Sequence, residues 1–380
     1  MSEWKMVKIG EICEQINGVS YKPADVYDSL TENATVLLRA NNIFEDKLNY
    51  DELVFVDKKR VSKNQYMKKG DILICASSGS KHLVGKAACL TEDKELTFGA
   101  FCKVLRPKTI NPEYIKHYFF SPFYRTEISR LSEGANINNI KAADLENLTI
   151  PLPTESEQNR IAKQLDKCIT IINKQKRALE KYDLLIKSRF IEMFGDPVTN
   201  PKKWEVKTLN EVCRKITDGK HGGCKLDDKS DYYYVGAREI FDLSIHYETA
   251  QKITKEDFEK DYKRCNLEIG DFCIVNTGAT IGKTAIAKDE KTTHTLLQKS
   301  VALLKVKPEE IIPLYLQYSY ITNESMYKVE SASAQPNLLL SKIRETKLMI
   351  PPLELQNDFA AFVQQIDKSK FELTYTCVAP

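Results

Sequence analysis

Two stretches of the chain, each followed by a long helical pattern, consist of short apolar runs separated by turn residues. Residues 71–76 and 301–306 are typical of these runs, because short apolar segments between turn signals favour buried strands. Near the end of each stretch the pattern predicts a helix with proline near its start, from Pro112 to about Leu131 and from Pro313 to about Val329. The pattern therefore predicts mixed α/β (α+β) globules of roughly 150 residues each.

The stretch between the two globules has a different pattern. Residues 155–193 contain no glycine or proline, Thr154 and Glu157 form a capping-box sequence before them, and Gly195 follows them. The a and d positions of a heptad repeat are mostly apolar: Ile161, Leu165, Cys168, Ile172, Gln175, Leu179, Tyr182, Ile186, Arg189 and Met193. This spacing predicts a coiled-coil helix about 58 Å long.

A second helix, predicted from about Glu354 to Leu373, offers a partner for the first. Its apolar residues follow the same spacing: Leu355, Phe359, Phe362, Ile366 and Leu373. Chain direction makes the pair antiparallel, and the shorter helix should end opposite Lys174 to Leu179. The seam formed by Ile161, Leu165, Cys168 and Ile172 would then lack a partner. We expect residues 158–174 to self-associate or to hold a partner subunit.

The two globules are copies of one unit. Trp4 recurs as Trp204, and further pairs of landmarks recur in the same order about 200 residues apart. These pairs include residues 38–43 with 235–240, which places Arg238 opposite Asn41, and also Gly70-Asp71 with Gly270-Asp271, Gly85-Lys86 with Gly282-Lys283, and Ile150-Pro151 with Ile350-Pro351. We expect domains at residues 1–153 and 195–353, with spacer helices at residues 154–194 and 354–380.

Composition narrows the function classes only slightly. The net charge is +3, since 56 basic residues nearly match 53 acidic ones, so a nucleic-acid partner is permitted and not demanded. The 10 cysteines form no C-x-x-C pair and do not cluster with the five histidines, so no metal site is expected. The start of the sequence lacks the apolar core of a signal peptide, and no apolar run reaches membrane-spanning length. We expect a cytoplasmic protein without a membrane partner.

Residues 150–162, which read Ile-Pro-Leu-Pro and continue into Glu-Gln and Ile-Ala, and residues 188–197, which end in Phe-Gly-Asp-Pro, resemble the specificity (S) subunit of Type I restriction–modification systems. The resemblance covers essentially the whole chain. It implies target-recognition domains that read the two halves of a bipartite site in double-stranded DNA, separated by antiparallel coiled-coil helices. It also implies methyltransferase (M) and restriction/translocase (R) partner subunits. S-adenosylmethionine, ATP and Mg would bind those partners, and this chain would need no cofactor.

One departure from the family pattern concerns the second spacer helix. In the family it is about as long as the first, whereas here the heptad pattern stops near Leu373.

Candidate DNA-contacting residues lie in matched polar or glycine-bordered loops of the two globules. They are Lys22, Arg39, Asn41, Asn42, Ser78, Lys81, His82, Lys86, Asn136, Asn138, Lys220, His221, Arg238, Thr277, Lys283, Gln335 and Asn337. Arginine, asparagine and glutamine can pair bidentately with base edges, and lysine can contact phosphates. Ordinary surface loops and solvated lysines remain the alternative for each. Because the globules differ at these positions, they should read different half-sites.

No catalytic set is found in the sequence. Gly278 and Gly282 are separated by three residues, whereas a phosphate-binding P-loop needs four. No Asn-Pro-Pro-aromatic motif of a methyltransferase and no local nucleophile–base set occurs, so we expect a binding protein rather than an enzyme. The alternative function is an assembly scaffold built on a coiled coil that does not bind DNA.

Overall fold

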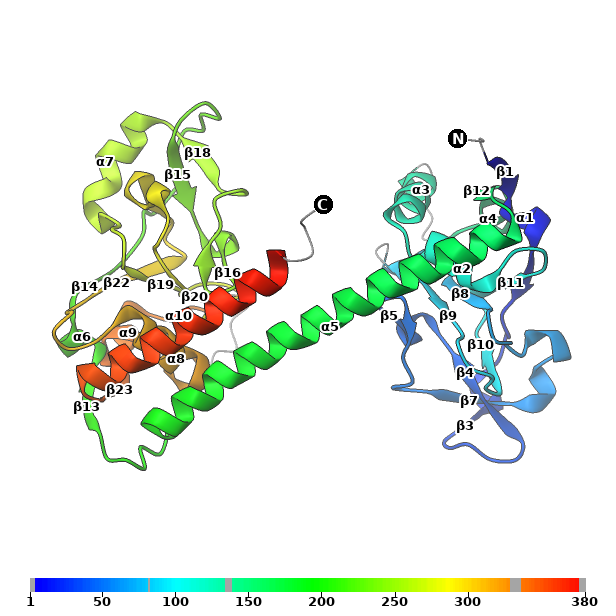
Figure 1. The fold of residues 1–380 in the computed structure, drawn as a ribbon, viewed down its shortest axis with the longest axis horizontal. Coiled ribbons are helices and arrows are strands. Elements are labelled where there is room, and N and C mark those ends of the chain that lie inside the picture. Colours follow the sequence, from blue (N-terminus) through cyan, green and yellow to red (C-terminus); the bar gives the residue numbers. More distant parts are fainter. Residues whose placement is uncertain (1–3, 81–82, 134–138, 329–335, 376–380) are drawn as a thin grey trace. The chain divides into compact units, whose positions relative to one another are not determined.

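The computed structural model describes residues 4–80, 83–133, 139–328 and 336–375 (Figure 1). The chain divides into two compact units, which we call unit 1 (residues 1–173) and unit 2 (residues 174–380). The boundary lies inside the long helix α5 (Glu155–Phe194), so each unit contains one globule and one part of this helix.

Unit 1 is built from short strands with helices near its end. Its strands are β1 (Lys5–Lys8), β2 (Cys13–Asn17), β3 (Val26–Tyr27), β4 (Ala34–Leu38), β5 (Ile43–Phe44), β6 (Lys47–Leu48), β7 (Val54–Asp57), β8 (Ile72–Cys75), β9 (Ala87–Cys89), β10 (Leu96–Phe98), β11 (Cys102–Pro107) and β12 (Thr149–Leu152). Its helices before α5 are α1 (Ile9–Ile12), α2 (Pro112–Phe119), α3 (Pro122–Glu133) and α4 (Ala142–Glu146), with 3-10 turns η1 (Pro23–Asp25), η2 (Ala40–Asn42), η3 (Lys58–Arg60) and η4 (Lys63–Gln65).

Unit 2 repeats this plan. Its strands are β13 (Glu205–Thr208), β14 (Cys213–Asp218), β15 (Tyr232–Val235), β16 (Ile240–Phe241), β17 (Ser244–Ile245), β18 (Gln251–Ile253), β19 (Phe272–Val275), β20 (Thr284–Ile286), β21 (Thr295–Leu297), β22 (Val301–Val306) and β23 (Lys347–Ile350). Its helices after α5 are α6 (Leu209–Val212), α7 (Lys255–Cys265), α8 (Pro313–Thr322), α9 (Leu340–Glu345) and α10 (Leu353–Tyr375), with turns η6 (Ala237–Glu239), η7 (Glu290–His294) and η8 (Glu324–Met326).

The sheets confirm that the two globules share one fold. The central sheet has the order β2-β11-β8-β9 in unit 1 and β14-β22-β19-β20 in unit 2. In both units the first and last strands of the globule pair antiparallel, β1 with β12 and β13 with β23. The other sheet contains one parallel pair in each unit, β4 with β10 and β15 with β21. The largest difference is α7, which stands in unit 2 where unit 1 has η3 and η4.

The helix predicted from Pro112 to about Leu131 is two helices, α2 and α3. The break falls at Ser121-Pro122, where the Ser121 hydroxyl accepts a hydrogen bond from the Tyr124 backbone N–H at 3.2 Å and caps the new helix. The helix predicted from Pro313 to about Val329 is also shorter than expected. It ends at Thr322, after which the Asn323 side chain caps η8.

Both predicted signals at the ends of the long helix are confirmed. The Glu157 carboxylate accepts hydrogen bonds from the backbone N–H and the hydroxyl of Thr154, at 3.1 and 3.0 Å. These charge-assisted bonds lower the pKa of Glu157. After the helix, Gly195 adopts a φ of 84°, the left-handed conformation in which a side chain would be strained.

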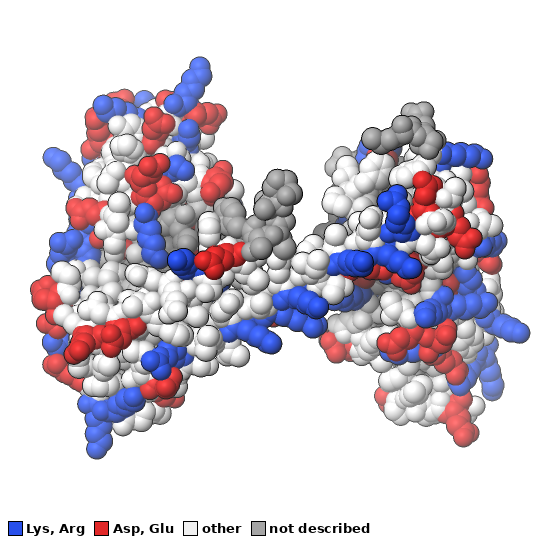
Figure 2. Space-filling model, in the orientation of Figure 1, with Lys and Arg blue, Asp and Glu red and all other residues white. Residues whose placement is uncertain are grey.

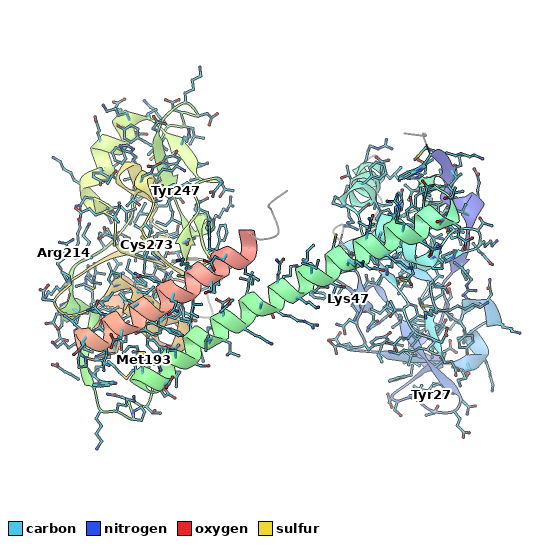
Figure 3. The ribbon with its side chains drawn as sticks, in the orientation of Figure 1. Tyr27, Lys47, Met193, Arg214, Tyr247 and Cys273 are labelled. Atoms are coloured by element: carbon cyan, nitrogen blue, oxygen red, sulfur yellow. The ribbon has the colours of Figure 1, made fainter. Side chains whose placement is uncertain are left out.

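The part of α5 in unit 2 packs antiparallel against α10, as predicted (Figure 1). The Gln175 side-chain N–H donates to the Leu373 carbonyl at 3.2 Å, so α10 ends opposite the expected part of α5. Near the other end of α10, the Phe190 ring lies 5.4 Å from Phe359, and both side chains are fully buried. Figure 3 places Met193 in the last turn of α5, where it packs against the same core.

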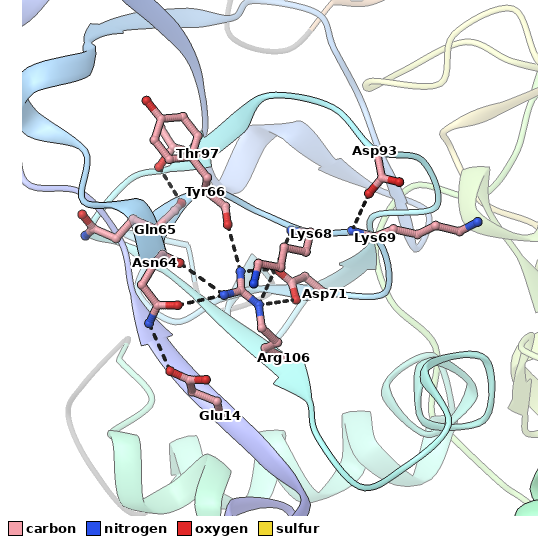
Figure 4. Close-up of polar contacts among 10 residues, drawn as sticks. All are labelled: Glu14, Asn64, Gln65, Tyr66, Lys68, Lys69, Asp71, Asp93, Thr97 and Arg106. Carbon is pink, nitrogen blue, oxygen red and sulfur yellow. Dashed lines mark hydrogen bonds and ion pairs between the residues drawn. The ribbon is translucent and has the colours of Figure 1, made fainter.

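A buried ion pair ties the central sheet to the adjoining loops in each unit. In unit 1 the Arg106 guanidinium binds both carboxylate oxygens of Asp71, at 2.7 and 3.0 Å, and also donates to Asn64 and to the Tyr66 carbonyl (Figure 4). In unit 2 the matched pair is Lys305 and Asp271, at 2.6 Å. The conserved position of the pair in both units supports the repeat, although the cation differs.

Candidate nucleic-acid interface

Unit 1 contains a cavity of about 760 Å³ at one end of its sheets. Four segments that follow strands form most of its wall, and Leu83 completes it: residues 19–21 after β2, 39–41 after β4, 77–79 after β8 and 99–102 between β10 and the start of β11. Strand ends fix the backbone of these short segments, while the side chains remain free to meet a ligand.

Three of the predicted residues, Arg39, Asn41 and Ser78, line this cavity. The Arg39 guanidinium donates to the Glu52 carbonyl at 3.0 Å, and the Asn41 amide donates to the Glu52 carboxylate at 3.4 Å. Phe101, which was not among the predicted site residues, also lines the cavity and is 71% exposed. The wall therefore combines hydrogen-bond donors with one large apolar side chain.

Unit 2 contains a cavity of about 750 Å³ lined by residues 237–239 after β15, by Phe241, Thr249 and Gln251, and by Gln298 and Ser300 after β21. The predicted residue Arg238 belongs to it. Arg238 is exposed and forms no hydrogen bond or ion pair with the residues that the structure describes. Gln298 and Ser300 were not predicted as site residues.

Backbone hydrogen bonds show that the two cavities share two equivalent wall segments, the turn after β4 or β15 and the segment after β10 or β21. The segments after β2 and β8 line the unit 1 cavity, whereas their counterparts in unit 2 do not line the unit 2 cavity. Val19 N–H donates to the Phe98 carbonyl, and Lys220 N–H donates to the Leu297 carbonyl, both at 2.7 Å. The turns η2 and η6 also match. The side chain of the last residue of each turn, Asn42 or Glu239, accepts a hydrogen bond from the backbone N–H three residues earlier. Arg238 is therefore the counterpart of Asn41, as expected.

The prediction for Asn42 is wrong. Its side chain is fully buried and accepts a hydrogen bond from the Arg39 backbone N–H at 2.9 Å. Its amide donates to the carbonyls of Asn49 and Asp51, at 3.1 and 2.9 Å. Asn42 is thus a turn residue that shapes the cavity wall and presents no group to a ligand.

Lys220 and His221 lie beside the cavity of unit 2, and each side chain contacts an acidic residue. Lys220 pairs with Asp261 of α7 and is largely buried, and this hydrogen bond raises the pKa of Lys220. His221 lies 3.0 Å from Asp218, which also binds Arg264 of α7. Both side chains already have partners within unit 2, which weakens the prediction that they contact DNA.

Lys86 and Lys283 follow matched glycines with positive φ, Gly85 and Gly282, but lie outside both cavities. Lys283 lines a different hollow of about 850 Å³, formed by the globule of unit 2, α10 and the part of α5 in that unit. Lys22 also lies outside the unit 1 cavity, at the start of η1. The structure thus does not gather the predicted lysines into one site.

Two further predictions fall in the loops before the last strand of each globule. Thr277 donates to the Asn337 side chain at 3.2 Å, and the same two residues form a β-bridge. The matching bridge in unit 1 joins Ser77 to Asn139, so the counterpart of Asn337 is Asn139 and not Asn138. The predicted residues Lys81, His82, Asn136, Asn138 and Gln335 lie outside the described residues.

Comparisons with known proteins are consistent with this repeated architecture. The chain matches the family of the Type I restriction modification DNA specificity domain over residues 1–181 and again over residues 201–376. The chain belongs to this family. It is a Type I specificity subunit, a non-catalytic subunit with a role in recognising DNA sequence, as the sequence predicted.

Individual relatives agree with this assignment. The chain is 42% identical to the Type I restriction enzyme StySPI specificity subunit of Salmonella potsdam, over 96% of this chain and 82% of the relative. It is 30% identical to the EcoKI specificity subunit of Escherichia coli K12, over the same shares of the two chains. The fold resembles that of the S subunit from M. genitalium, with a TM-score of 0.54 at 15% identity over 98% of this chain and 91% of that one.

Further properties of this specificity subunit concern metals, thiols and membranes. No group of three or more metal-binding side chains occurs among the described residues. Most described cysteines are buried, and burial raises the pKa of Cys13 to about 12; Cys273, labelled in Figure 3, is likewise buried in unit 2. No helix in the described part of the chain is long and apolar enough to cross a membrane.

The spacer helices of this specificity subunit bury only part of the predicted seam. Ile186, Phe359 and Ile366 are buried, and Leu179, Tyr182 and Phe362 are half-buried. Leu165, Cys168 and Ile172 are exposed, as predicted. The prediction that Ile161 belongs to the exposed stripe is wrong, because its side chain packs against the core of unit 1.

Proposed function

We propose that this chain selects the target of a Type I restriction–modification complex by reading a bipartite DNA sequence, one half with each unit. The observation that carries the proposal is that the two cavities share two wall segments whose backbones are equivalent and whose side chains differ. Equivalent segments would meet DNA in the same way in both units. Different side chains then select different bases.

The chemistry of the cavity walls suits base edges. Arg39, Asn41 and Ser78 in unit 1, and Arg238, Gln251 and Gln298 in unit 2, supply the donors and acceptors that distinguish base pairs in the major groove. Phosphate contacts would be shared with partner subunits, because Lys and Arg are interspersed with Asp and Glu over the face seen in Figure 2. We expect weak binding by the chain alone and tighter binding within the complex.

The exposed stripe on α5 is the place that we propose for a methyltransferase subunit. Leu165, Ile169 and Ile172 follow one face of the helix and are 39%, 41% and 50% exposed. They continue the seam that α10 covers from Gln175 onward, so a partner helix would extend an existing interface. The restriction/translocase subunit would join this assembly, and S-adenosylmethionine, ATP and Mg would bind the partners.

Exchange of residues 1–153 for the same unit of a relative tests the bipartite proposal. Methylation mapping in cells that supply the methyltransferase subunit should show one half of the target changed and the other half retained. Changes in both halves would contradict independent reading. A complex that assembles but shows no sequence-specific methylation or binding would favour the alternative, a scaffold that does not bind DNA.

The Leu165→Glu variant tests the proposed docking stripe. We expect weaker association with the methyltransferase subunit in sedimentation or pull-down, whereas Lys163→Glu, an exposed substitution nearby, should have little effect. If the isolated wild-type chain forms dimers that Leu165→Glu disrupts while methyltransferase binding is unchanged, the stripe holds a second copy instead.

A further inference from the structure

Two positions face each other across the wall of each cavity, and their backbones are equivalent. In unit 1 the Gly99 N–H donates to the Leu38 carbonyl at 2.9 Å, which places Gly99 beside Arg39. In unit 2 the Gln298 N–H donates to the Val235 carbonyl at 2.8 Å, which places Gln298 beside Gly236. Arg39 therefore matches Gly236, and Gly99 matches Gln298.

The side chains at these positions are exchanged between the units. Unit 1 has a long polar side chain on the strand β4 side and glycine on the β10 side, whereas unit 2 has glycine after β15 and a long polar side chain after β21. A Cβ on Gly236 would lie 2.4 Å from the Gln298 side-chain oxygen, so a larger residue at this position would displace the Gln298 amide. Each cavity thus holds one long polar side chain in the same region, supplied from opposite sides.

Each of the two side chains, Arg39 and Gln298, keeps hydrogen-bonding groups without a partner among the described residues. The Arg39 Nε is buried without a hydrogen-bond partner among the described residues. The Gln298 side-chain amide forms no hydrogen bond with any residue that the structure describes, although it lines the cavity. A buried or half-buried polar group without a protein partner is costly unless a ligand or water satisfies it.

We propose that Arg39 in unit 1 and Gln298 in unit 2 are specificity-determining residues that each read one base of the half-site, guanine by Arg39 and adenine by Gln298. Arginine pairs bidentately with O6 and N7 of guanine, and glutamine with N6 and N7 of adenine. In unit 2, Gly236 leaves room for the Gln298 amide to lie against the backbone. This inference rests on the proposed function and adds the base class that each unit reads.

Gln298→Glu tests the assignment with almost no change in shape. Glutamate accepts hydrogen bonds and donates none, so it suits the N4 amino group of cytosine. The variant complex, with its methyltransferase subunit, is selected against a library of random duplex DNA. We expect one position of the unit 2 half-site to lose its adenine preference by about tenfold or more and to favour cytosine. The control Gln364→Glu carries the same charge change on the exposed face of α10 and should leave the selected sequence unchanged.

Gly236→Ala provides a second, purely steric test. Gly236 has a φ of −121°, which alanine adopts without strain, so the added methyl group acts only by displacing the Gln298 amide. We expect loss of preference at the same base position as in Gln298→Ala, and no further loss when the two changes are combined. The paired change Arg39→Gly with Gly99→Gln should move one position of the unit 1 half-site from guanine towards adenine.

The outcomes separate this inference from the proposed function. A wild-type complex that selects no sequence contradicts the proposed function. A wild-type complex that selects a bipartite sequence, with Gln298→Glu weakening binding equally on all sequences, overturns the inference and leaves the proposed function intact.

Discussion

The side-chain oxygen of Gln356 accepts a hydrogen bond from the backbone N–H of Ile312 at 2.9 Å, and this contact fastens α10 to the globule of unit 2. The Gln356 amide also donates to the Pro351 carbonyl at 2.9 Å, and the side chain is fully buried. In unit 1, Gln158 binds the Asn111 N–H and the Pro153 carbonyl, also at 2.9 Å. In each unit, a glutamine in the first turn of the spacer helix therefore connects the helix to the globule through side-chain hydrogen bonds.

Replacing Gln356 should destabilise unit 2. Gln356→Leu fills a similar volume but leaves the Ile312 N–H and the Pro351 carbonyl buried without partners. We expect the free energy of unfolding to fall by about 2–3 kcal/mol, measured by denaturant unfolding of the full chain. Gln364→Leu, on the exposed face of the same helix, is the matched control and should change stability by less than about 0.5 kcal/mol. Equal losses for the two variants would contradict the role of Gln356.

The ion pair of Arg106 and Asp71 predicts an asymmetry between two substitutions. Arg106→Leu leaves the Asp71 carboxylate, whose side chain is only 1% exposed, without its partner and should cost about 3–5 kcal/mol. Arg106→Lys keeps the charge, as Lys305 does in unit 2, but loses the bonds to Asn64 and the Tyr66 carbonyl, so we expect a loss of about 1–2 kcal/mol. Thermal unfolding of both variants measures the difference. Similar losses would show that the charge contributes little.

The Asp218 cluster predicts a pH dependence of stability. Burial acts to raise the pKa of Asp218, but hydrogen bonds from Arg264 and His221 outweigh it, so the pKa lies below its ordinary value. The folded state therefore binds fewer protons than the unfolded state, and this stabilisation is present above the unfolded pKa and is lost as pH falls through the folded value. We expect the wild type to lose stability more steeply than Asp218→Asn below about pH 4. Parallel curves for the two proteins over that range would refute the prediction.

The length of α5 should set the unread spacer of the target, if each unit reads one half-site. Deleting residues 167–170 removes about one helical turn, or roughly 6 Å. We expect the spacer between the half-sites to change by about one or two base pairs while both half-sites stay the same. Methylation mapping of the variant complex gives the result directly. If the number of base pairs between the half-sites is unchanged, the length of α5 does not set the spacer.

Local signals made the architecture predictable from the sequence. The Thr154–Glu157 cap, Gly195 and the heptad positions act within a few residues of one another, so they defined α5 without knowledge of the fold. The strand pattern and the repeated landmarks defined the paired globules for the same reason. The break before α3 carried a signal as well, since Ser121-Pro122 is a helix start, but the helical pattern on either side concealed it.

The site was less predictable because contacts distant in sequence decide it. Asn42 has the side chain of a base reader, yet backbone groups up to nine residues away use all of its amide. Lys220 resembles a free cation until α7 brings Asp261 to it. Gln298 was missed because it lies against Gly236, which is 62 residues earlier in the chain. A comparison of Arg39 with Gly236 in the two copies could have revealed the exchange.

The pairing of β1 with β12 has a consequence for how new variants arise. Met6 lies opposite Pro151, so the chain enters and leaves the first globule through neighbouring strands, and β13 and β23 close the second in the same way. A domain whose two ends meet behaves as a cassette, because its replacement leaves the flanking helices in register. Genetic recombination at the borders of the helices would therefore exchange a complete globule in one event, and shuffling two sets of cassettes would yield many combined specificities without any new fold.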